Sequence, residues 1–296
     1  MRLGASLPAR GDMTCESAEM RPGGRGACTA AALAALRSRV TFITCLGADP
    51  FSGPILTGLS QRGINTGFIP RSARLCTGLV HSLIEPSGAA RRVFSPGAAM
   101  DLTVRHIHKA SVQFASADIV IVTPDIPRDT FLAALRQAHE LGRPVIVDPS
   151  PADRVQPQDL AECDIISADA GTAAALCGWE IRSHGDAQRC AARFLAQGAG
   201  AAAIDLAQRG VFTASGAPKV TCTPAPADAS FDHAEARAAF NAGLAWALAL
   251  GYTLSQAAWI AQSAAAAMDS VPSVLHDFPS FPGFDALIAR QTLHIR

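Results

Sequence analysis

The sequence contains very little lysine and has no excess of either charge. Its only lysines are Lys109 and Lys219, and its 25 basic residues are matched by 25 acidic ones, so the net charge is zero. A neutral chain has no general electrostatic attraction to nucleic acid or to an acidic membrane surface. We therefore expect no nucleic-acid partner and no membrane partner.

Long apolar runs are also missing. The longest ones are rich in alanine and broken by polar residues, and none reaches the ~20 residues that a helix needs to span a bilayer. The opening residues, MRLGASLPARGDMT, lack the apolar centre of a signal peptide. Both absences predict a cytoplasmic location.

The cysteines form no Cys-x-x-Cys pair, and no histidine lies at metal-ligand spacing from them. This scatter argues against a zinc site and against a disulfide framework. We expect small buried thiols in a reducing compartment. The eight residues are Cys15, Cys28, Cys45, Cys76, Cys163, Cys177, Cys190 and Cys222.

What the chain does contain is a regular alternation of strand and helix patterns, starting near residue 39. Short runs rich in Val and Ile are typical of buried parallel strands, and the longer stretches between them are helical. This order predicts an α/β fold with a doubly wound, mostly parallel central sheet flanked by helices. The predicted strands cover residues 40–46, 119–123, 145–148 and 165–167. The predicted helices cover 129–141, 171–177, 187–197 and 234–268, the last interrupted at Gly251.

Two segments depart from this order. Residues 10–22 and 74–95 alternate like hairpin strands, and the second has a turn at 86–88. We expect them to form a small antiparallel β-flap, or lid, on the central sheet. With no internal repeat and no linker, residues 1–296 are interpreted as one domain.

Five motifs then follow one another in a fixed order. They are PGGRGACTA at 22–30, GADPFSG at 47–53, PGA at 96–98, the pair GRPVIVDPSP and CDIISADAGTAAALCG, and TPAPADASFDHAEARAAFNAG near the last helices. Together they resemble the ribokinase-like, or PfkB, carbohydrate kinases. The resemblance implies transfer of the γ-phosphoryl of ATP, with Mg²⁺, to a hydroxyl of a small sugar or nucleoside. It also implies a flap that covers the sugar and that forms a homodimer interface in many members.

The resemblance places the sugar site at Gly23, Gly24, Cys28 and Asp232. Cys28 stands where the family has an asparagine, so a hydrogen-bonding amide is lost. Nucleotide contacts are implied at Asp205, Gly210 and Gln262. Asp205 replaces a hydroxyl residue that would meet the triphosphate.

The catalytic turn of the family, Gly-Ala-Gly-Asp at a helix N-terminus, is replaced here by Glu235-Ala236-Arg237-Ala238. Ala238 occupies the position of the general base and cannot accept a proton. Glu235 would place a carboxylate near the phosphate, and the anion-hole positions now carry side chains. For Arg237 two interpretations stay open, a phosphate ligand or a solvated side chain. We favour the second, because helix N-termini do not attract cations.

The magnesium motif is changed too. The family's Asn-x-x-Glu is represented by Asp169-Ala170-Gly171-Thr172, in which Asp169 can still ligate a hard cation but the glutamate is missing. The first strand of the family, with its sugar-binding aspartate, is also expected to be absent, because the segment that follows it begins near Leu7. A start codon assigned too far downstream and a sheet that lacks a strand both explain this.

The losses concentrate at the base, the anion hole, the metal site and the sugar clamp, while the scaffold is kept. We therefore predict a degenerate kinase retained for ligand binding or dimerisation. The alternatives are an active phosphotransferase with an unusual site and a non-functional truncated product.

Overall fold

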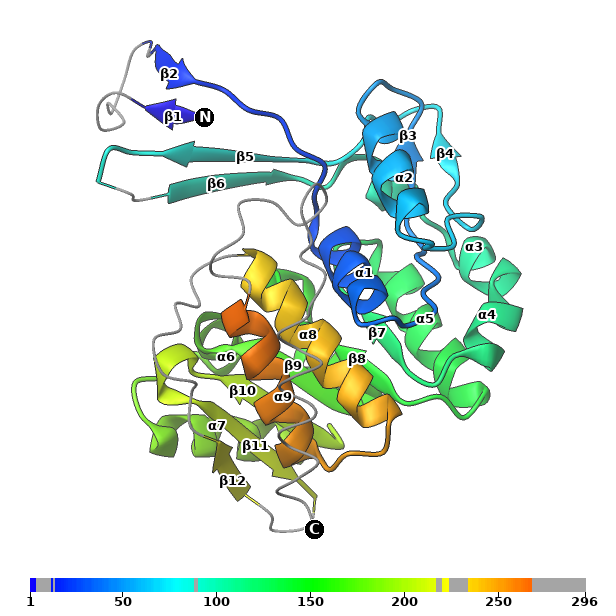
Figure 1. The fold of residues 1–296 in the computed structure, drawn as a ribbon. Coiled ribbons are helices and arrows are strands. Elements are labelled where there is room, and N and C mark those ends of the chain that lie inside the picture. The colour runs from blue at the N-terminus through cyan, green and yellow to red at the C-terminus, as the bar shows by residue number, and fades with distance from the viewer. Residues whose placement is uncertain (4–11, 13, 88–89, 217–219, 224–233, 268–296) are drawn as a thin grey trace.

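The computed structural model of the protein describes residues 1–3, 12, 14–87, 90–216, 220–223 and 234–267. It confirms the predicted α/β organisation, with helices on both faces of a central sheet and a separate flap (Figure 1). Among these residues no helix has the length and apolar character needed to cross a membrane.

The central sheet has six strands in the order β12-β11-β10-β9-β8-β7. Strands β7 to β10 are parallel, whereas β11 and β12 are antiparallel to their neighbours. The strands are β7 (Val120–Val122), β8 (Val145–Val147), β9 (Ile165–Asp169), β10 (Ala201–Asp205), β11 (Val211–Ser215) and β12 (Val220–Thr223).

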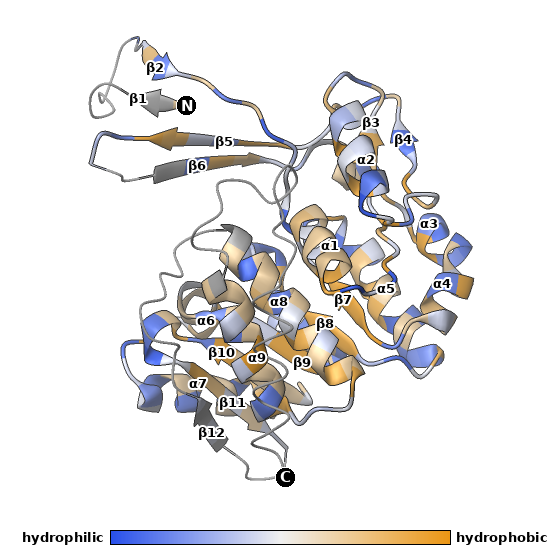
Figure 2. Ribbon diagram, in the orientation of Figure 1, coloured by the Kyte–Doolittle hydropathy of each residue, from blue (hydrophilic) through white to orange (hydrophobic). Residues whose placement is uncertain are grey.

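The sheet is buried on both faces, as its continuous apolar strands require. In β8, Val145 and Val147 belong to one hydrophobic cluster, and Ile146, which points the other way, belongs to a second one. Helices α5 (Arg128–Glu140), α6 (Ala170–Cys177) and α7 (His184–Ala196) cover the first face. Helices α1 (Arg25–Ala35), α8 (Ala234–Ala249) and α9 (Leu254–Ala267) cover the second. The hydrophobic strands between these layers stand out in Figure 2.

The flap is a four-stranded sheet in the order β2-β1-β5-β6. It consists of β1 (Arg2–Leu3), β2 (Cys15–Ser17), β5 (Leu79–Ile84) and β6 (Ala90–Ser95). The prediction of an antiparallel flap is confirmed for β2, β5 and β6. Strand β1 was not expected, and it pairs parallel to β5. The flap exposes Val80, Val93 and Phe94.

The strand predicted over residues 40–46 forms only in part. Its end pairs as β3 (Leu46–Gly47) with β4 (Arg71–Ser72), and Thr41 makes an isolated bridge to Asn65. The cause is a missing neighbour, because the side that faces β7 borders a cavity instead of another strand. Strand β7 is the last of its sheet, and no strand of the described residues pairs with its outer edge.

The remaining helices connect these parts. Helix α2 (Ser52–Gln61) lies next to β3 and β4, and α3 (Val104–Lys109) and α4 (Ser111–Ser116) lead into β7 (Figure 1). Cys177 at the end of α6 and Cys190 in α7 form a disulfide. The expectation of thiols only was therefore wrong for this pair, whose Cα atoms, 6.1 Å apart, lie within disulfide range.

Candidate functional site

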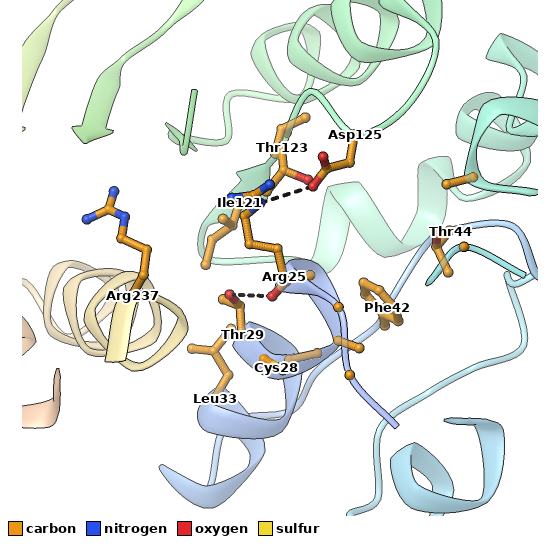
Figure 3. Close-up of a pocket in the computed structure, with 18 of the residues that line it drawn as sticks. Arg25, Cys28, Thr29, Leu33, Phe42, Thr44, Ile121, Thr123, Asp125 and Arg237 are labelled. Atoms are coloured by element: carbon orange, nitrogen blue, oxygen red, sulfur yellow. Dashed lines mark hydrogen bonds and ion pairs between the residues drawn. The ribbon is translucent and has the colours of Figure 1, made fainter. Parts of the chain in front are cut away.

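A cavity of about 2800 Å³ opens between the flap and the central sheet and continues along β7. Figure 3 shows its walls around Arg25, Phe42 and Ile121. The structure brings most of the predicted site residues to this cavity. Those that line it are Gly23, Gly24, Cys28, Asp169, Asp205, Ala236 and Arg237.

Four aspartates follow the carboxyl ends of four neighbouring parallel strands. Asp125 comes shortly after β7, Asp148 directly after β8, and Asp169 and Asp205 end β9 and β10. In open α/β sheets ligands bind outside this edge. The position of the four carboxylates therefore identifies the site independently of any family motif.

Arg25 and Asp125 form an ion pair in the wall of the cavity that also contains the predicted sugar-site residues Gly23 and Gly24. Arg25 is the first residue of α1, and its Nε lies 3.1 Å from Asp125 Oδ2. Its guanidinium also lies 5.7 Å from the centre of the Phe94 ring on the flap, within cation–π range. Asp125 was not among the predicted site residues, although a carboxylate that comes shortly after the strand predicted at 119–123 indicates a position at the ligand-binding edge of the sheet. Gly24, with φ +103°, sets the direction in which the chain enters α1.

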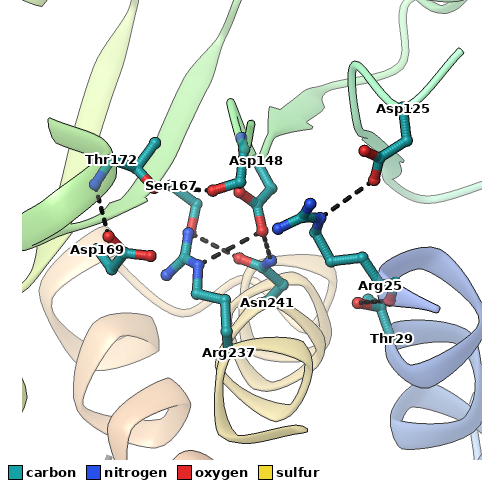
Figure 4. Close-up of polar contacts among 10 residues, drawn as sticks. Arg25, Thr29, Asp125, Asp148, Ser167, Asp169, Thr172, Arg237 and Asn241 are labelled. Carbon is teal, nitrogen blue, oxygen red and sulfur yellow. Dashed lines mark hydrogen bonds and ion pairs between the residues drawn. The ribbon is translucent and has the colours of Figure 1, made fainter. Parts of the chain in front are cut away.

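Arg237 points from α8 towards the carboxyl ends of β8 and β9 (Figure 4). Its Nη2 donates to Ser167 Oγ at 2.8 Å, and its Nε lies 3.4 Å from Asp148 Oδ2. The side chain is only 9% exposed and its guanidinium lies 5.0 Å from the centre of the Phe240 ring. The expectation of a solvated side chain was therefore wrong. The negative charge of Asp148 holds the Arg237 guanidinium in place, and the position of Arg237 near a helix N-terminus does not reveal this partner.

Asn241 completes this network. Its side-chain amide donates to Asp148 Oδ2 at 2.6 Å and its carbonyl accepts from Ser167 Oγ at 2.7 Å. Asp148 is 0% exposed, and it also accepts from the Ser150 backbone N–H at 3.2 Å. Burial of an unpaired carboxylate would lower the free energy of unfolding by roughly several kcal/mol. Arg237 and Asn241 thus offset the free-energy cost of burying the Asp148 carboxylate.

The position predicted for the general base is apolar in three dimensions as well as in sequence. Ala238 is 0% exposed and packs in the cluster beneath α8. Ala236, at an anion-hole position, is also buried. Glu235 lies in α8, but its side chain is outside the described part of the structure, as is Asp232. Their predicted roles stay predictions.

Asp169 caps α6 instead of pointing freely into the cavity. Its Oδ1 accepts from the Thr172 backbone N–H at 2.7 Å, and the Thr172 hydroxyl lies 2.8 Å from Ser150 Oγ. Among the described residues no group of three or more His, Cys, Asp or Glu side chains is arranged to hold a metal ion. With Arg237 already placed against Asp148, these residues do not fit a bound Mg²⁺.

The residues predicted to contact the nucleotide belong to a tight turn between β10 and β11 or pack against it. Asp205 Oδ1 accepts from the Ala207 backbone N–H at 2.9 Å, and the Leu206 N–H donates to Gly210 O at 2.9 Å. Gly210 has φ +90°, which favours glycine. Gln262, fully buried on α9, donates to Ala207 O at 2.8 Å. Gly210 and Gln262 therefore hold this turn from behind and do not line the cavity.

The pKa of Asp205 is raised, chiefly by burial. Arg237 and the Ala207 N–H lower it, and the charge of Asp169 raises it again. The pKa of Asp205 thus depends both on Arg237 of α8 and on Asp169 of the neighbouring strand. The charges of Arg237, Asp169 and Asp205 therefore interact at the carboxyl ends of β9 and β10.

The parallel sheet between two helical layers, the flap over its carboxyl edge and the glycine pair before α1 define the ribokinase-like class of α/β proteins. A family model described as pfkB family carbohydrate kinase matches residues 5–279, so the chain belongs to that family. The family uses ATP, generally with Mg²⁺.

Curated relatives agree with this assignment. The chain is 28% identical to ribokinase of Haemophilus influenzae over 258 residues, which cover 86% of this chain and 83% of that one. It is 26% identical to ribokinase of Bacillus subtilis over 244 residues, or 82% and 80% of the two chains.

Solved structures share the fold. Ribokinase of Thermotoga maritima superimposes with a TM-score of 0.85 at 23% identity, covering 97% of this chain and 94% of that one. A ribokinase of Arabidopsis thaliana, solved with ribose and ATP, gives 0.85 at 21% identity, with 96% and 92% covered. A nucleoside kinase of Burkholderia thailandensis, solved with inosine, gives 0.77 at 17% identity, with 98% and 94% covered.

Proposed function

We propose that this protein is a degenerate carbohydrate kinase that binds a small sugar or nucleoside but does not phosphorylate it. One observation carries the proposal, the methyl group of Ala238 at the position of the general base. Loss of a positioned base alone lowers the rate of proton transfer by about 10²–10⁴-fold. The carboxylate of Asp148, at the end of β8, is engaged by Arg237 and Asn241.

The charges at the phosphate end support the absence of turnover. Asp148, Asp169 and Asp205 bring three carboxylates to this end, and Arg237 supplies one compensating cation. A triphosphate would meet an excess of negative charge there and would be repelled. The substitutions therefore weaken nucleotide binding as well as catalysis.

The sugar end keeps groups that suit a polyhydroxylated ligand. Asp125 can accept hydrogen bonds from hydroxyls, and Arg25 can donate them. Both line the cavity together with the backbone of Gly23 and Gly24. The structural neighbours solved with ribose and with inosine bind ligands of this chemistry. A small sugar or nucleoside is therefore the ligand class that the cavity supports best.

The flap supports a second role within the same proposal, self-association. Val93 on β6 is 59% exposed, and it points to the face opposite to that of Phe94, which lines the cavity with Val80. An exposed apolar side chain on the outer face of the flap favours an interface. We expect light scattering to show a homodimer, and Val93→Arg to convert it to a monomer.

The central test combines binding and turnover. Calorimetry with ribose, deoxyribose, adenosine and inosine is expected to show binding of at least one of them. ADP release from ATP·Mg²⁺ with the same panel is expected to stay at the level of the Asp125→Ala control. Sugar-dependent ADP release by the unmodified protein would contradict the proposal and identify an active phosphotransferase.

A single variant tests whether the lost base explains the lost activity. Ala238→Asp restores the carboxylate of the turn and keeps the Arg237 cation beside Asp148, and we expect it to gain sugar-dependent turnover. Circular dichroism and thermal unfolding verify that it folds, because the new carboxylate would enter the buried position that Ala238 occupies. Ligand binding by the unmodified protein tests the proposal separately from this variant.

A further inference from the structure

The guanidinium of Arg237 lies within a group of carboxylates that no other described cation neutralises. Its Nε is 3.4 Å from Asp148 Oδ2, and Arg237 is the cation whose charge is felt at Asp205. Asp205 in turn faces Asp169 across the β9–β10 pair. Asp148 and Asp205 therefore share one buried positive charge, and Asp169 adds its own negative charge beside Asp205.

Arg237 acts there as a charge more than as a hydrogen-bond donor. An arginine has five N–H donors, yet Nε and Nη1 of Arg237 are buried without a hydrogen-bond partner among the described residues. Only Nη2 donates, to Ser167 Oγ. Its position is fixed by the attraction of Asp148 and by packing over the Phe240 ring.

We propose that Arg237 is a tethered cation that takes the place of a divalent metal ion between Asp148 and Asp205. The carboxyl ends of three neighbouring strands then hold a side chain of the protein where hard cations would otherwise be attracted by oxygen ligands. A divalent ion that approached these carboxylates would meet a fixed positive charge. Folding and ligand binding by this chain are therefore independent of Mg²⁺.

The test compares the unmodified protein with Arg237→Met, which keeps much of the side-chain volume and removes the charge. The probes are MgCl₂ and MnCl₂ alone, followed by thermal unfolding and by the electron paramagnetic resonance signal of free Mn²⁺. The unmodified protein is expected to show no shift in Tm and no Mn²⁺ uptake at millimolar concentration. Arg237→Met is expected to melt several degrees lower and to regain stability when either ion is added. Arg25→Met, which removes a cation from the sugar end of the same cavity, is expected to gain no metal response.

Two further variants keep the test decisive if Arg237→Met does not fold. Arg237→Lys retains the charge and is expected to fold without metal and to bind no Mn²⁺. Arg237→Met with Asp148→Asn removes both buried charges together and is expected to fold and to bind no Mn²⁺. Mn²⁺ binding by the unmodified protein would overturn the proposal, and so would a folded Arg237→Met without any metal response. These readouts do not depend on whether the protein binds a sugar or releases ADP.

Discussion

Asp205 lies directly opposite Asp169 in the register of β9 and β10. Two like charges on neighbouring strands repel each other, and Asp205 is only 8% exposed. Burial raises the pKa of Asp205, and the facing Asp169 adds to that rise. Two facing carboxylates do not improve the packing of these strand ends, because they repel each other.

The raised pKa makes stability depend on pH. A carboxyl whose pKa is higher in the folded state contributes most below its ordinary pKa, and this contribution is lost as the pH rises through the raised value. We expect Asp205→Asn to be more stable than the unmodified protein at neutral pH, with the difference shrinking as the pH falls. Urea unfolding at a series of pH values measures it.

Asp186 provides the matched control for this prediction. Its pKa is lowered, first by the Ser183 hydroxyl, which donates to its carboxylate. Its contribution is therefore present at neutral pH and is lost on acidification. Asp186→Asn is expected to destabilise the protein at neutral pH and less so in acid. If both variants followed the same pH trend, the assignment to Asp205 would be wrong.

Asn241 is expected to be essential for stability. Asn241→Leu removes the donor to Asp148 and the acceptor for Ser167, and a buried carboxylate then lacks one of its hydrogen bonds. The expected loss is about 2–3 kcal/mol in the free energy of unfolding. Gln256→Ala, at the exposed start of α9, should cost no more than about 1 kcal/mol. Equal losses in the two variants would mean that the network around Asp148 contributes nothing specific.

The contact between α8 and α9 leaves no room for a side chain at Gly243. A Cβ there would lie 2.9 Å from Ala261 Cα and 3.1 Å from the Ala264 Cβ. Gly243→Ala is expected to cost about 1–3 kcal/mol because the helices must separate. Gly53→Ala is the control, since nothing lies within 4 Å of a Cβ at Gly53 in α2. That change should stabilise the protein by up to about 1 kcal/mol, and denaturant unfolding compares the two.

The Arg25–Asp125 pair is expected to affect ligand binding more than folding. The two side chains are partly exposed, so the ion pair contributes at most about 1 kcal/mol to stability. Asp125→Asn and Arg25→Met should each weaken sugar binding roughly tenfold, as for the loss of one hydrogen bond to a charged group. Calorimetry against thermal unfolding separates the two effects. Unchanged affinity in both variants would place the sugar elsewhere in the cavity.

Much of the fold could be predicted because short Val and Ile runs mark buried strands. The runs at 119–123, 145–148 and 165–167 correspond to β7, β8 and β9. The run at 40–46 has the same composition, yet it forms regular pairing only at its end. Composition reports the tendency to form a strand, but pairing also requires a neighbour. Whether a neighbouring strand is present depends on the arrangement of the whole sheet, so it cannot be predicted from the local sequence.

Motif positions from distant parts of the sequence meet at one cavity, which Gly23, Gly24 and Asp169 line, and their roles stay predictions. Contacts between charges of distant segments could not be predicted from local sequence. Arg237 was interpreted from its place on a helix, but Asp148, 89 residues earlier in the sequence, determines where it lies. Cys177 and Cys190 likewise become partners only through the packing of α6 against α7.

The outer edge of β7 has a consequence for how the protein is handled. Its backbone groups border the cavity and no described strand pairs with them. An open strand edge is a template for another extended chain. We therefore expect the protein to bind a short β-forming peptide along this edge within the cavity, so preparations should be kept free of such peptides.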